Sequence, residues 1–314
     1  MLKFKMTLVW VLLMATQAWA QLSTSPAFPT DGGNVTITFN AAKGNKALMN
    51  YATTSDVYVH CAVITNLSAN GGDWRYNKFT WGVVNAAAKA TPSGTNRYTY
   101  SITNIRTFFG VPAAETIQKI VMVFRNGTGS IVAKNDDWTD MYVRVGKSGV
   151  IQARLSTPAM KSTFNTTPET ITATLGASYT VGGTASASTN LKLQHNGVQF
   201  ANVTGTSVSG SRTITAGNQK FKLIPNNDAT KADSFSFFIP AASTVAALPA
   251  GVRDGINYVS STSTTLVLHA PGKNNVILLG DFNNWTPSLT YQMKKTADGQ
   301  KFWITLTGLT AGTE

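Results

Sequence analysis

The sequence predicts an all-β protein built from three consecutive β-sandwich domains of immunoglobulin-like or early-set type, the last of them incomplete. Short runs that alternate between apolar and polar residues recur between turn signals, and long amphipathic helical patterns are absent. Only 13% of the residues are charged, while Thr, Ser, Asn, Gly and Ala are abundant. This combination is typical of sheets that pack face to face rather than of helical layers.

Residues 1–20 have the pattern of a signal peptide. Lys3 and Lys5 precede a mostly apolar run, and Ala18 and Ala20 supply small residues for cleavage. The apolar run is too short to span a bilayer, and no other segment of the sequence has the length and apolarity of a membrane anchor. We therefore expect an exported chain, secreted or held at the cell surface.

The first expected domain covers residues 21–147. Val35–Phe39 alternates cleanly, whereas Ile120–Phe124 is apolar on both sides, as a central strand would be. Met141–Val145 is the expected closing strand. Cys61 is the single cysteine of the chain, so stability has to come from core packing, and we expect this thiol to be buried.

The second expected domain covers residues 148–243 and is interpreted as an immunoglobulin-like spacer. Asn196-Gly197 lies between two alternating runs, and both residues suit the positive φ angles of a two-residue hairpin turn. The run 234–239 is expected to be the last strand, because Pro240 ends it.

Tryptophan in polar loops is the strongest functional signal of the first domain. Trp74 and Tyr76 follow Gly71-Gly72-Asp73, and Trp138 lies within Asn135–Asp140. A flat ring beside hydrogen-bonding groups suits a sugar, whose C–H face packs on the indole while its hydroxyls bind polar side chains. The alternative is that Trp74 and Trp138 fold back over the ends of the sandwich.

Trp81 is a further candidate for carbohydrate binding, although it lies in Lys78–Val83, which has the pattern of a strand and would favour a position in the core.

The third expected domain, residues 244–314, contains Gly280-Asp281-Phe282-Asn283-Asn284-Trp285 between two expected strands, Val276–Leu279 and Lys301–Leu306. This order resembles the early-set β-sandwich of glycogen-branching enzymes and isoamylases, and the glycogen-binding domain of the AMP-activated kinase β-subunit. The resemblance implies that Trp285 lies in a glucan site. It also leaves a structural alternative, in which Phe282 is buried and Asp281 and Asn283 bond the backbone of the turn.

Asp56 to Trp81 resembles an N-terminal module of secreted amylase-like proteins from Bacteroidetes-type bacteria, and the resemblance spans most of Val35 to Val145. That resemblance implies starch binding. Together the two resemblances predict the non-catalytic, α-glucan-binding N-terminal region of a secreted alpha-amylase superfamily glycoside hydrolase, with a catalytic barrel expected downstream. The alternative is a cell-surface protein of immunoglobulin-like repeats that binds another polysaccharide or a protein.

Catalysis within these residues has little support. The only glutamates are Glu115, Glu169 and Glu314, and no pair of carboxylates matches a glycosidase motif. Whether the chain itself is an enzyme is left open, and the expected parent is a glycoside hydrolase. No cofactor is expected apart from calcium, for which three loop carboxylates are weak candidates: Asp136, Asp137 and Asp140. The formal charge of +12 is spread singly along the chain, which does not favour nucleic-acid binding.

Overall fold

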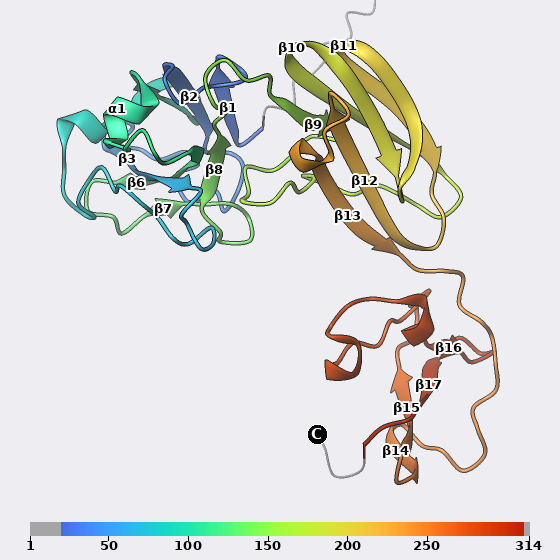
Figure 1. Cartoon of the computed structure of the whole chain (residues 1–314). Coiled ribbons are helices and arrows are strands. Elements are labelled where there is room, and N and C mark those ends of the chain that lie inside the picture. Colours follow the sequence, from blue (N-terminus) through green and yellow to red (C-terminus); the bar gives the residue numbers. More distant parts are fainter. Residues whose placement is uncertain (1–19, 311–314) are drawn as a thin grey trace, which may run out of the picture. The chain divides into compact units, whose positions relative to one another are not determined.

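The computed structural model describes residues 20–310, so nearly all of the expected signal peptide lies outside the described residues. The chain divides into two compact units, one reaching Ser148 and including Ser162–Phe164, the other made of Gly149–Lys161 and Asn165 onwards. Strands dominate both units, and the expected all-β class is confirmed (Figure 1). The one α-helix of the described residues is α1 (Ile105–Phe109), and none of their helices is long and apolar enough to cross a membrane.

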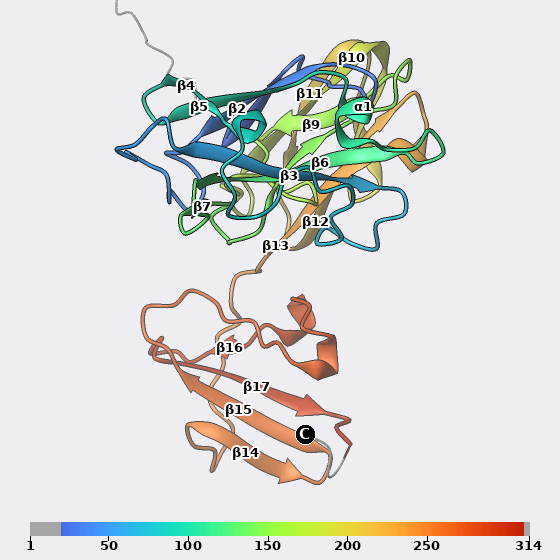
Figure 2. The ribbon, with the colours of Figure 1, turned by 90° about the vertical axis from the view of Figure 1, so that its left-hand side faces the viewer.

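The first unit consists of two antiparallel sheets (Figure 2). Sheet 1 has the order β1 (Leu22–Ser25), β2 (Val35–Asn40), β5 (Arg97–Ile102) and β4 (Thr91–Gly94). Sheet 2 has the order β3 (Val57–Thr65), β6 (Ile117–Asn126) and β7 (Val132–Ala133), with β8 (Met141–Arg144) also paired to β6.

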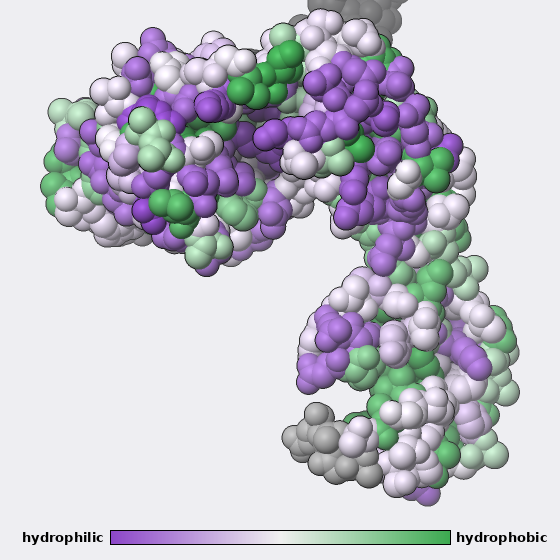
Figure 3. Space-filling model, in the orientation of Figure 1, coloured by the Kyte–Doolittle hydropathy of each residue, from purple (hydrophilic) through white to green (hydrophobic). Residues whose placement is uncertain are grey.

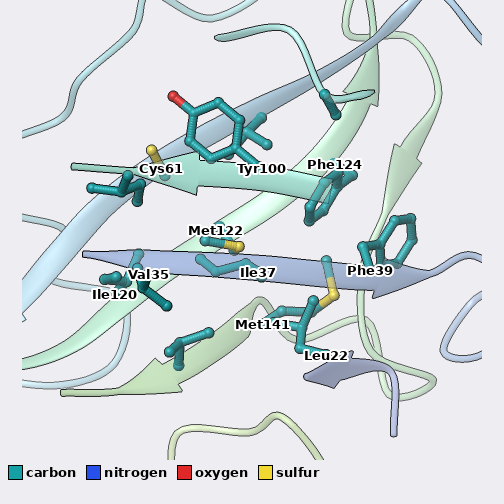
Figure 4. Packing of buried hydrophobic residues seen from close by; sticks show 14 of the residues in the cluster. Leu22, Val35, Ile37, Phe39, Cys61, Tyr100, Ile120, Met122, Phe124 and Met141 are labelled. Carbon is teal, nitrogen blue, oxygen red and sulfur yellow. The ribbon is translucent and has the colours of Figure 1, made fainter. Parts of the chain in front are cut away.

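The core of this unit lies between the two sheets. The alternation predicted for β2 is confirmed, because Val35, Ile37 and Phe39 are buried and the residues between them are only half-buried. Phe39 stacks on Phe124 of β6 with ring centroids 4.4 Å apart (Figure 4). Cys61 is fully buried in the same core, and burial raises the pKa of its thiol. The expected structural thiol is therefore confirmed.

The central strands of sheet 2 are buried on both faces. Ala62 and Ile64 of β3 and Val121 of β6 point away from the main core and form a second, smaller apolar cluster with Tyr142. Segments from distant parts of the chain cover this outer face, and together with β3 and β6 they supply the side chains of the candidate site described below.

The second unit begins with a five-stranded sheet. Its order is β11 (Val198–Thr213), β10 (Ser178–His195), β12 (Gly217–Pro225) and β13 (Asp233–Ile239), with β9 (Ala153–Thr157) also paired to β10. The register of β10 shifts between Thr184 and Thr189, so its first half pairs with β9 and its second half with β12. The predicted hairpin is confirmed, with φ of 49° at Asn196 and 85° at Gly197.

The four-stranded sheet at the end of the chain has the order β14 (Gly255–Ser260), β15 (Ser263–His269), β17 (Lys301–Thr307) and β16 (Lys294–Lys295). The strand expected at Lys301–Leu306 is confirmed as β17. The strand expected at Val276–Leu279 is wrong, because this segment makes only an isolated bridge at Ile277 and none of its four side chains is buried. One of its backbone carbonyls, that of Leu278, accepts a hydrogen bond of 3.0 Å from Asn283 Nδ2 in the next turn instead of from a neighbouring strand.

Replacing Phe39 by Ala should destabilise the first unit, because the change removes a fully buried ring from a stacked pair and leaves a cavity. We expect a loss of about 3–5 kcal/mol in the free energy of unfolding, measured by urea denaturation with circular dichroism. The exposed side chain of Leu67 in the same unit offers a control, and Leu67→Ala should change stability by less than about 0.5 kcal/mol. Equal losses in the two variants would contradict the core assignment.

Candidate functional site

A polar segment of the first unit, which includes Arg75 and Lys78, runs along the edge of β3 that faces away from β6. Arg75 exchanges two backbone hydrogen bonds of 2.9 Å with Val63, and the Lys78 N–H donates to the Cys61 carbonyl at 3.0 Å. After Lys78 the chain leaves this edge, so the strand expected at Lys78–Val83 is wrong. Trp81 is consequently not a core residue, and 48% of its surface is exposed.

Trp74, His60 and Trp81 meet on the outer face of sheet 2, and we refer to these three residues as the aromatic cluster. The His60 ring stacks on Trp74 with centroids 5.6 Å apart and planes 26° apart. It meets Trp81 at 5.1 Å with the planes at 90°. Trp74 also packs on the smaller apolar cluster of this face, which makes it a support rather than an open ring.

Arg125 of β6 lies beneath Trp81. It is fully buried, and its guanidinium carbon is 5.7 Å from the ring centroids of both Trp81 and Tyr58. One terminal nitrogen donates to the carbonyls of Asn126 and Gly127 at 2.8 and 2.7 Å, and the other donates to the Val83 carbonyl at 2.8 Å. Burial lowers the pKa of this guanidinium, whose charge is met by carbonyl dipoles and ring faces.

The loop between β7 and β8 lies on the other side of β6 from β3, because both strands pair with that edge of β6. Lys134 and Asp140 flank this loop and form an ion pair of 2.9 Å. Trp138 at its tip is 71% exposed and has a φ of 64°. Burial and the charge of Arg125 lower the pKa of His60, and the charge of the Asp140 carboxylate opposes them.

Tyr76 is held apart from the aromatic cluster. Its ring packs against the main core, and its hydroxyl donates to Glu115, which also accepts from Thr65 at 2.9 Å. The hydrogen bond to Glu115 raises the pKa of Tyr76 and lowers that of the carboxyl group. Tyr76 therefore stabilises the β3 edge, and the structure gives it no place in a site with Trp81.

Trp285 lies in the last part of the chain, on the turn after Gly280. Its indole is 65% exposed, its φ is 53°, and its Nε1 donates to Asp281 at 2.8 Å. Asn283 bonds the turn backbone as expected, accepting from the Gly280 N–H at 3.0 Å. The burial expected for Phe282 in the structural alternative is wrong, since this ring is 40% exposed. The corner thus presents aromatic rings to solvent instead of closing a core.

The expected calcium ligands do not converge in the structure. Asp137 accepts from the backbone and hydroxyl of Thr139 at 3.0 and 2.6 Å, and Asp140 is paired with Lys134. Between residues 20 and 310, no three His, Cys, Asp or Glu side chains lie close enough to hold a metal ion.

Sequence reasoning missed two members of the site, His60 and Arg125. The alternation of Val57–Val63 contains a signal for His60, because it places this residue on the face opposite to Cys61. The sequence gives no comparable signal for Arg125, because its contacts with Val83, Trp81 and Tyr58 join parts of the chain that are far apart.

No protein-family model matches this sequence. No curated protein matches it either. Among solved structures, the chain is similar to the fibronectin(III)-like modules of Clostridium thermocellum CbhA, with 13% identity over 69% of this chain and 93% of that chain and a TM-score of 0.23. It is also similar to the Escherichia coli adhesin FdeC, with 14% identity over 93% of this chain and 89% of that chain and a TM-score of 0.20.

Gly129 positions Trp81 and offers a test of the cluster. Its φ is 76°, and a Cβ there would lie 3.0 Å from Trp81 Nε1. Gly149 has a φ of 78° with no atom within 4 Å of such a Cβ, so it provides a control with backbone strain alone. Both alanine variants should lose about 1–2 kcal/mol of stability, because both place an L-residue in the left-handed region.

Only Gly129→Ala should also change the near-ultraviolet circular dichroism of the tryptophans, because only there does the new methyl group displace an indole. Identical spectra for the Gly129→Ala and Gly149→Ala variants would contradict the packing described for Trp81.

Proposed function

We propose that this chain is a non-catalytic α-glucan-binding region of a secreted amylase-type glycoside hydrolase, and that the aromatic cluster is its main glucan site. The observation that carries the proposal is that Trp81 is both exposed to solvent and fixed in orientation. About half of its surface is open to solvent, while His60, Arg125 and the backbone of Gly129 fix its orientation.

A fixed and open indole suits the recognition of a sugar. The ring covers the apolar C–H face of a pyranose, and binding then costs little side-chain entropy because the ring is already ordered. Asp140, whose charge acts on His60, and its ion-pair partner Lys134 offer hydrogen-bonding groups for sugar hydroxyls. These features support a neutral sugar chain as the ligand.

The two most exposed tryptophans support the same conclusion. Trp138 and Trp285 both have positive φ angles, and a bulky residue in this region costs on the order of 1–3 kcal/mol. Their high exposure means that little burial of the indole offsets this cost. A ligand that packs on the rings would supply the missing contact area.

The proposed mechanism is tethering. Weak stacking at the aromatic cluster and at Trp285 would hold a glucan chain near a catalytic barrel downstream, and so raise the local concentration of substrate. Both resemblances described above, the module around Trp74 and the early-set corner at Trp285, support α-glucan as the polysaccharide.

Removal of the Trp81 indole should weaken binding of the chain to soluble amylopectin. We expect Trp81→Ala to reduce affinity roughly tenfold, or about 1.4 kcal/mol, in affinity gel electrophoresis. Tyr258 is 84% exposed but lies outside the predicted sites, so Tyr258→Ala should leave migration unchanged. Unretarded wild-type protein, or equal retardation of the Trp81→Ala variant, would refute the proposal.

Calorimetry with a short maltooligosaccharide should distinguish the two glucan sites. Wild-type chain is expected to bind about two ligands, whereas Trp81→Ala and Trp285→Ala should each bind about one. On amylopectin each single variant should lose simultaneous attachment, and the double variant should lose more because neither site remains. A stoichiometry that is unaffected by Trp285→Ala would assign binding to the first unit alone.

A further inference from the structure

His60 is the central ring of the aromatic cluster, and it is held by packing rather than by hydrogen bonds. Its ring contacts both indoles. Its Nδ1 atom is buried and has no hydrogen-bond partner among the described residues. A neutral imidazole tolerates one such nitrogen at modest cost, whereas an imidazolium carries a proton and positive charge on both nitrogens.

The groups that face His60 determine how readily it takes up a proton. Arg125 on β6 disfavours the charged form, and Asp140 before β8 favours it, although Lys134 already neutralises that carboxylate at 2.9 Å. Tyr58 is two residues away on the same face of β3, and it contributes a phenol ring that lies against Arg125. The two indoles that contact the His60 ring carry no charge.

We propose that protonation of His60 disrupts the support of Trp81, so that the glucan affinity of the first unit falls as the solution becomes acidic. This inference rests on the proposed function of the aromatic cluster. A second cation next to buried Arg125, with a buried N–H that lacks an acceptor, makes the stacked position unfavourable. The imidazolium then moves out toward water and the Asp140 carboxylate, and Trp81 loses the contact that orients it.

The direction of titration agrees with this geometry. Burial lowers the pKa of His60 from its ordinary value of 6.5, Arg125 lowers it further, and Asp140 partly opposes them. The cluster is therefore intact at neutral pH. Because the folded-state pKa lies below the unfolded-state value, the unfolded chain takes up this proton first. The stability that neutral His60 contributes is fully present above 6.5 and is lost as the pH falls through the folded-state pKa.

The test compares amylopectin affinity of the full chain at about pH 7.5 and about pH 4.5, where a histidine of lowered pKa becomes charged. Wild-type affinity should fall roughly fivefold or more between these conditions. His60→Gln removes the titrating group, so it should weaken binding at neutral pH but make the ratio of the two affinities close to one. His269 is exposed on β15 and provides the matched control, and His269→Gln should keep the wild-type ratio.

The tryptophan fluorescence of the ligand-free protein supplies a second readout that does not depend on glucan. Wild-type and His269→Gln proteins should show an acid transition below neutral pH that His60→Gln lacks. Absence of glucan binding at neutral pH would refute the proposed function, and the fluorescence transition would still decide whether His60 controls the cluster. An identical pH profile in wild-type and His60→Gln proteins would overturn the inference.

Discussion

The burial of β3 and β6 on both faces is the constraint from which the rest of the first unit follows. One face of each strand packs into the main core, and the other carries Ala62, Ile64 and Val121. A sheet of this kind is stable only if something covers its second face. Trp74 and Phe164 pack on that second face and cover it, so Trp74 has a structural role. The first unit therefore has its aromatic rings on this face for a structural reason before any ligand is considered.

Arg125 connects this packing to the electrostatics of the site. A fully buried cation is costly unless hydrogen bonds and polarisable neighbours replace its water. Three carbonyl groups and two aromatic rings do so for the terminal nitrogens, whereas Nε is buried without a hydrogen-bond partner among the described residues. The acceptors come from the turn after β6 and from Val83, so the same side chain holds both segments together. Trp81 belongs to the Val83 segment, and its ring centroid lies 5.7 Å from the guanidinium carbon of Arg125, a charge that the solvent does not reach.

The sequence predicted those elements whose signal is local. The alternation of β2 and the Asn196-Gly197 turn depend on neighbouring residues, and both were predicted correctly. The segments 78–83 and 276–279 do not form the expected strands. A run with a strand pattern becomes a strand only if the free edge of a sheet is available along its whole length. The candidate site was predicted in part. Trp81 and Trp138 are exposed as glucan binding requires, but the contact of Trp81 with His60 depends on packing between distant parts of the chain.

The two candidate glucan sites differ in how firmly their indoles are held, and this difference has a physical consequence. Trp81 is fixed by a ring, a guanidinium and a backbone contact, whereas Trp285 has a single side-chain hydrogen bond, to Asp281. When a ring becomes ordered only on binding, its loss of conformational entropy offsets part of the free energy gained from its contacts. The first unit is therefore the better candidate for intrinsic affinity. Trp285 gains most when a polymer is already attached elsewhere, because the second contact is then intramolecular and the weaker ring no longer has to capture the chain from solution.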